Sequence, residues 1–143
     1  MSELLAVFCC GVFFGAALYI TLVQHPAALQ VGSSFAGAFF GPMYRRAAPM
    51  QVALALVGSL TGLWTWWQGA GSAWLAGALL LFSVVPFTLL RMSSVNQLLL
   101  AHAAGREDSE TDALLRRWGP LHAARTVLSG LSFVVFLWAL AFG

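Results

Sequence analysis

The sequence contains four apolar stretches, each about as long as a lipid bilayer is thick. They cover residues 4–24, 49–67, 72–90 and 122–142. A helix needs roughly 20 apolar residues to cross a hydrocarbon core of about 30 Å. Strands are disfavoured because an open sheet edge would leave backbone groups unpaired in lipid. The chain is therefore predicted to be all-α: an integral membrane, antiparallel four-helix transmembrane bundle that forms a single domain over residues 1–143.

Composition supports a lipid environment and excludes a nucleic-acid partner. Hydrophobic residues make up 60% of the chain and charged residues only 8%, whereas a soluble domain carries roughly a quarter charged residues. The net charge of +2 is too small, and the basic residues are too scattered, for a nucleic-acid surface. Cys9 and Cys10 are adjacent and form no CxxC motif, so we interpret them as small buried hydrophobes.

The basic residues predict how the spans are oriented. The first connection covers residues 25–48 and the third covers 91–121, whereas Gln68 to Gly71 form a tight second turn. All seven arginines lie in the first or third connection or within one helical turn of the third: Arg45, Arg46, Arg91, Arg106, Arg116, Arg117 and Arg125. The positive-inside rule then places both termini outside. Five tryptophans cluster at the opposite ends of the spans, as expected for the other interface: Trp64, Trp66, Trp67, Trp74 and Trp138.

The two long connections contain elements of their own. Residues 34–44 (SFAGAFFGPMY) are too apolar for a free linker, and we predict a short interfacial helix or a re-entrant piece there. Ser109 and Asp112 form a capping signature for a helix that continues past Pro120 into the fourth span. Residues 105–110 are the only stretch that we expect to be disordered. Two GxxxG motifs, at residues 11–15 and 58–62, favour close helix packing.

Polar residues gather at the predicted cytoplasmic end of the bundle. His25 ends the first span and His122 begins the fourth, so both are expected at the same depth. Arg125 follows His122 by three residues and shares its helix face. Six further polar residues are expected nearby: Tyr44, Arg46, Gln51, Thr88, Arg91 and Asn96. Polar groups near hydrocarbon mark a functional candidate.

Structural roles compete with the functional interpretation of this cluster. The arginines can reach lipid phosphates with their charged ends. Gln51 and Asn96 can bond neighbouring helices, the two histidines can cap helix ends, and His102 is interpreted as ordinary surface. A metal site is not predicted, because no carboxylate lies near His25 and His122 in the spans and no ExxH motif is present. No cofactor motif is evident, which leaves copper and haem open.

Four stretches of the chain resemble a known family in their order and spacing. They are GAALYI at 15–20 followed by QHPA at 24–27, YRRAAPMQ at 44–51, PFT at 86–88 with Asn96 and Leu99, and LRRW at 115–118 with His122 and Arg125. Together they resemble the anthrone-oxygenase-like family, small four-span membrane proteins that mostly have no assigned function. The resemblance covers nearly the whole chain.

The resemblance implies a limited set of expectations. A few fungal relatives are associated with oxidising a polyketide anthrone to an anthraquinone. The residues to which the resemblance extends are His25, Gln51, Asn96, Trp118, His122 and Arg125. Under this hypothesis His122 removes a proton from the substrate, with His25 as the alternative base. Arg125 and Asn96 stabilise the resulting oxyanion, and Trp118 stacks on the ring.

Three classes of function therefore remain in view. The first is an oxidoreductase or oxygenase that acts on a small lipophilic aromatic molecule. The second is a non-enzymatic binder or carrier of a lipid, quinone or haem, and the third is an accessory subunit of a membrane complex. A transporter would need a homo-oligomer to build a pore, and the oligomeric state is left open. The lysine-free, Ala/Leu/Arg-rich composition is typical of a high-GC bacterium and favours its inner membrane.

Overall fold

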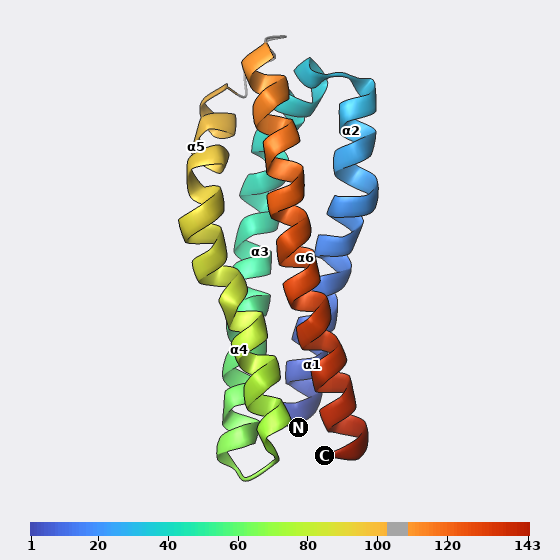
Figure 1. The fold of residues 1–143 in the computed structure, drawn as a ribbon, viewed down its shortest axis with the longest axis vertical. Helices are drawn as coiled ribbons and strands as arrows, with labels where there is room; N and C mark the ends of the chain where they lie inside the picture. Colours follow the sequence, from blue (N-terminus) through green and yellow to red (C-terminus); the bar gives the residue numbers. More distant parts are fainter. Residues whose placement is uncertain (103–108) are drawn as a thin grey trace.

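The chain forms four long helical segments, which run antiparallel along one axis (Figure 1). The structure is a computed structural model that describes residues 1–102 and 109–143, with His102 described by its backbone only. In chain order the elements are α1 (Ser2–Tyr19), the π-helical turn η1 (Ile20–Gln24), α2 (His25–Val31), α3 (Ser33–Trp67), α4 (Ser72–Phe87), the π-helical turn η2 (Thr88–Met92), α5 (Ser93–His102) and α6 (Ser109–Phe142). No strand occurs in these residues.

The predicted all-α membrane bundle is confirmed, with helices longer than the predicted spans. Four continuous helical segments are long and apolar enough to cross a membrane: Ser2–Val31, Ser33–Trp67, Ser72–Ala101 and Ser109–Phe142. The chain is thus a multi-pass membrane protein. Both termini and the turn between α3 and α4 lie at one end of the bundle (Figure 1).

The first connection differs from the prediction. The chain reverses at Gly32, whose φ of +133° is open to glycine and strained for other residues. Residues 34–44 are helical, but they form the beginning of α3 rather than a separate interfacial helix. The physical reason is packing: buried Ala36 and Phe40 of this segment belong to one core cluster with Leu115 and Trp118 of α6. The bundle therefore extends beyond the predicted span.

The third connection is also largely helical. Helix α6 covers Ser109–Phe142, so Ser109 and Asp112 lie in the first turn that the structure describes, and the helix continues without a break through Pro120. Its first turns are tied by Arg116, whose Nε donates to Asp112 Oδ2 over 2.7 Å. Of the stretch predicted to be disordered, Ser109 and Glu110 are helical. Residues 105–108 lie outside the described part of the chain.

Two core clusters lie one after the other along the axis of the bundle. The terminal half, defined as residues 2–17, 54–85 and 126–142, contains the cluster around Trp74, Leu81 and Phe136. The distal half, defined as residues 18–53, 86–102 and 109–125, contains the cluster around Phe40, Met92 and Trp118. All five prolines and both π-helical turns belong to the distal half.

Candidate functional site

One face of α6 brings three candidate residues together. Trp118, His122 and Arg125 are separated by four and three residues, which places them on the same side of a helix. This side faces the interior of the distal half, where Trp118 and His122 are buried. Residues of η1, α3, α4 and α5 complete the surroundings.

The imidazole of His122 is held from the first helical segment. Its Nδ1 lies 3.0 Å from Thr21 Oγ1 of η1, and the same hydroxyl lies 2.8 Å from Thr126 Oγ1. The indole of Trp118 stacks on the imidazole at a centroid distance of 4.5 Å. His122 is only 2% exposed, and within the described part of the chain its Nε2 makes no hydrogen bond. One ring nitrogen is thus fixed while the other is available for proton exchange.

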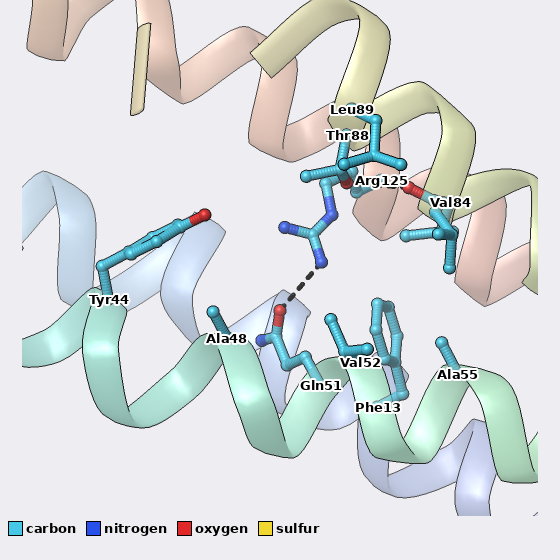
Figure 2. A pocket seen from close by; sticks show the side chains of 11 residues that line it. Phe13, Tyr44, Ala48, Gln51, Val52, Ala55, Val84, Thr88, Leu89 and Arg125 are labelled. Atoms are coloured by element: carbon cyan, nitrogen blue, oxygen red, sulfur yellow. Dashed lines mark hydrogen bonds between the residues drawn. The ribbon is translucent and has the colours of Figure 1, made fainter. Parts of the chain in front are cut away.

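The guanidinium of Arg125 lies between α3 and α4 and is bonded to an amide rather than to an acid (Figure 2). Its Nη2 donates to Gln51 Oε1 over 2.9 Å, and its Cζ lies 5.6 Å from the centre of the Phe13 ring. Among residues 1–102 and 109–143, Arg125 forms no ion pair. The Nε of Arg125 and the Nε2 of Gln51 are buried without a partner there. A cation left without a countercharge in an apolar setting is costly.

Trp118 and Asn96 already have partners inside the protein. The indole Nε1 donates to Asn96 Oδ1 over 2.9 Å, and Asn96 Nδ2 donates to the Tyr44 hydroxyl over 3.4 Å. Besides His122, the rings of His25 and Phe40 contact the indole at centroid distances of 5.0 and 5.5 Å. These contacts make Trp118 and Asn96 a rigid support for Tyr44 and His122.

Two small cavities adjoin at Arg125. The first has a volume of about 80 Å³ and is lined by apolar side chains together with Tyr44, Gln51, Thr88 and Arg125. The second, of about 20 Å³, is lined by Tyr44, Gln51 and Arg125 and also by Asn96, Trp118 and His122. A water needs about 10–15 Å³ of such volume. The first cavity therefore has room for several waters, and the second for one.

The remaining predicted residues are distributed unevenly. Thr88 lines the first cavity and donates its hydroxyl to Val84 O over 2.7 Å. His25 lines a separate cavity of about 10 Å³ on the other side of Trp118. Arg46 and Arg91 are exposed and line neither cavity at Arg125. The side chain of His102 lies outside what the structure describes.

Several residues of the site carry no clear sequence signal. Thr21 and Thr126 bond to one another beside His122, and Phe13 packs on Arg125, although α1 begins far away in sequence. Thr126 follows His122 by four residues, which is a usable hint. Thr21 and Thr88 lie in the two π-helical turns, a feature often found at functional sites.

Metal-ligating side chains are sparse around the site. Within residues 1–102 and 109–143, no group of three or more His, Cys, Asp or Glu side chains is close enough to hold a metal ion. Among the described side chains, His122 can supply acid–base transfer and Arg125 can supply charge stabilisation.

Comparison with known proteins assigns the family. Residues 40–135 match the anthrone oxygenase family. No curated protein and no solved structure gave a match. The matched region contains Tyr44, Gln51, Asn96, His122 and Arg125, whereas His25 lies before it. Since the match spans most of the sequence, the chain belongs to the anthrone oxygenase family.

Proposed function

We propose that this protein is a membrane oxidoreductase that adds oxygen from O₂ to a small lipophilic aromatic molecule beside His122 and Arg125. The observation that carries the proposal is that a buried imidazole and a guanidinium without an ion pair to any described residue line the same cavity. Such a pair can remove a proton and stabilise the anion that remains. Family membership supports the same class of reaction.

The proposed reaction converts an activated methylene between two aromatic rings into a ketone. The methylene loses one proton to a base, and the resulting carbanion is delocalised as an oxyanion onto the ring carbonyl. Addition of O₂ and a proton gives a hydroperoxide. Loss of the second C–H proton and cleavage of the O–O bond then release water. One oxygen atom of O₂ enters the product and the other leaves as water, so atoms and electrons balance.

The residues have distinct roles in this scheme. His122 Nε2 takes the proton, while Thr21 holds the opposite nitrogen over 3.0 Å. Arg125 and Gln51, joined over 2.9 Å, stabilise the oxyanion in place of the Asn96 amide, which is already bonded to Trp118. Trp118 orients His122 rather than stacking on the substrate, because three protein rings already surround its indole.

Single replacements of the two histidines test the scheme. His122→Ala is expected to lower turnover of an anthrone by about 10²–10⁴-fold, the usual contribution of a general base. His25→Ala is the matched control, because its ring also contacts Trp118 but lies in another cavity. Size-exclusion profiles and circular dichroism check that both variants fold. Unchanged turnover in folded His122→Ala would reject the scheme, and a loss confined to His25→Ala would move the base to His25.

We further propose that the distal half faces the cytoplasm of a bacterium and that the protein resides in the inner membrane as a single domain. The exposed arginines of the distal half support this orientation: Arg45, Arg46, Arg91, Arg116 and Arg117. Exposed Trp64, Trp67 and Trp138 support an interface at the other end. A C-terminal alkaline phosphatase fusion is expected to be active and a C-terminal green fluorescent protein fusion dark. The opposite pattern would reverse the orientation.

A further inference from the structure

Two buried hydrogen-bond donors point to a ligand that the fold itself does not supply. Gln51 is 3% exposed, and its Nε2 has no partner among the described residues. Arginine has only donors, so Gln51 must turn its oxygen toward Arg125 and leave its amide nitrogen unused. The Nε of Arg125 is buried and equally unpartnered there. Both residues line the first cavity (Figure 2).

The charge and the lining of that cavity define the chemistry of the ligand. The two unused donors and the positive charge call for an anionic oxygen. The other lining side chains are mainly apolar, including Phe13, Val84 and Val85. We infer that the cavity between α3 and α4 binds the anionic oxygen of a lipophilic acid that reaches it sideways from the bilayer. This inference uses the site of the proposed function but does not depend on the reaction.

The position of the cavity explains the sideways route. Two of its lining residues, Val52 of α3 and Leu89 of η2, are 48% and 65% exposed on the flank of the bundle. Ligand pockets for drug-sized molecules hold about 300–1,000 Å³, whereas this cavity holds about 80 Å³. The anionic oxygen of the lipophilic acid therefore occupies the cavity, while the apolar body of the acid lies in the cavity mouth between Val52 and Leu89.

A charged and a neutral probe of the same shape test this inference. Anthracene-9-carboxylate and anthracene-9-carboxamide are titrated into the full-length protein in detergent, and their fluorescence anisotropy is recorded. The carboxylate is expected to bind about 10- to 100-fold more tightly than the carboxamide, the usual advantage of hydrogen bonds to a charged group. Equal affinities would overturn the inference.

Two substitutions locate the effect and one controls for charge. Arg125→Gln should abolish the preference for the carboxylate. Gln51→Glu places a carboxylate beside Arg125, so it should expel the anionic probe without lowering the unfolding temperature. Arg117→Gln, at an exposed arginine of the same helix that lines no cavity at Arg125, should leave the preference unchanged. A preference that persists in both Arg125→Gln and Gln51→Glu would contradict the assignment.

Two further experiments distinguish a free lipophilic acid from a phospholipid, and ligand binding from the proposed reaction. Phospholipid phosphates are the other source of an oxyanion in a membrane. If phospholipids occupied the site, the carboxylate probe would lose its affinity when the protein moved from detergent into phospholipid nanodiscs. The assignment of the cavity to a free lipophilic acid would then fail. Binding of the carboxylate without oxidation of an anthrone would keep the inference and reject the oxidase proposal. Oxidation without any charge preference would do the reverse.

Discussion

The terminal half of the bundle has closely packed helices, whereas the distal half has helices whose regular hydrogen bonding is interrupted. In the terminal half, small residues let helices approach closely: a Cβ added to Gly62 or Gly77 would lie 2.7 or 2.6 Å from the Phe136 ring. The distal half instead contains all five prolines and both π-helical turns, which interrupt regular helix bonding. The prolines and the π-helical turns therefore lie in the same half as the polar residues of the candidate site. Departures from local rules are expected at functional sites.

Hydrogen bonding separates the halves in the same way. In the terminal half, Ser132 Oγ donates to Gly77 O over 2.7 Å and Thr65 Oγ1 donates to Thr61 O over 2.9 Å. Ser59, whose hydroxyl is buried without a partner among the described residues, is an exception. In the distal half, Gln51 Nε2 and Arg125 Nε have no partner among the described residues, and both side chains lie beside a cavity. This difference fits a terminal half that stabilises the fold and a distal half that carries the proposed site.

The largest expected difference between the halves comes from replacing Arg125, a partly buried cation of the distal half. Arg125→Met should lower turnover of an anthrone by about 10²–10³-fold, the usual result of losing an oxyanion donor. The unfolding temperature should not fall, because the guanidinium has no ion-pair partner in the described part of the chain. Turnover assays and thermal unfolding in detergent measure the two quantities, with Arg117→Met as the control. A folded, fully active Arg125→Met protein would contradict the proposal that the distal half carries the site.

A glycine of the terminal half should show the converse pattern. Gly77→Ala would bring a Cβ within 2.6 Å of two atoms of the Phe136 ring, which is fully buried and packs against Trp74. Such overpacking typically costs about 1–3 kcal/mol. Chemical denaturation should reveal this loss, while turnover per folded molecule stays at the wild-type value. Unchanged stability would show that the close approach is not important.

A smaller effect is expected where Thr21 positions His122. Thr21→Val keeps the shape of the side chain and removes its 3.0 Å contact with Nδ1. One hydrogen bond is worth about 1 kcal/mol, so kcat should fall up to about tenfold while KM stays constant. Steady-state kinetics separates the two constants. Rescue by Thr21→Ser would assign the effect to the hydroxyl, and an equal fall in Thr21→Ser would contradict that role.

The smallest effect concerns a glycine with open space around it. A Cβ added to Gly15 meets no atom within 4 Å. Alanine favours a helix interior over glycine by up to about 1 kcal/mol. Gly15→Ala should therefore raise the free energy of unfolding slightly and leave turnover unchanged. Chemical denaturation and turnover assays, run alongside Gly77→Ala, measure both quantities. Destabilisation of both variants alike would remove the distinction between packed and open glycines.

The sequence predicts the bundle well because lipid leaves the backbone few choices. Four apolar stretches must become helices, and the structure contains a long apolar helical segment over each of them. The extent of α3 was less predictable, since Pro42 and Pro49 usually end helices but lie inside this one. Its extension depends on Phe40 packing against Trp118, a contact between residues far apart in sequence.

The candidate site is predictable only along a single helix. The spacing of His122 and Arg125 predicts a shared face, and both residues line one cavity. Spacing does not tell how separate helices are rotated, so it cannot distinguish inward Gln51 from outward Arg46 and Arg91. Thr21 was missed because the π-helical turn that carries it inserts an extra residue and changes the face it presents.

Isotope labelling can show whether the protein transfers oxygen from O₂ to an anthrone with the help of His122. Protein in nanodiscs is supplied with an anthrone under ¹⁸O₂, and the product is analysed by mass spectrometry against protein-free nanodiscs and folded His122→Gln. We expect the wild-type protein to accelerate the oxidation and to place one ¹⁸O atom in each quinone, and we expect His122→Gln to lose this acceleration. Rates equal to the protein-free reaction, or equal in wild type and His122→Gln, would contradict this expectation.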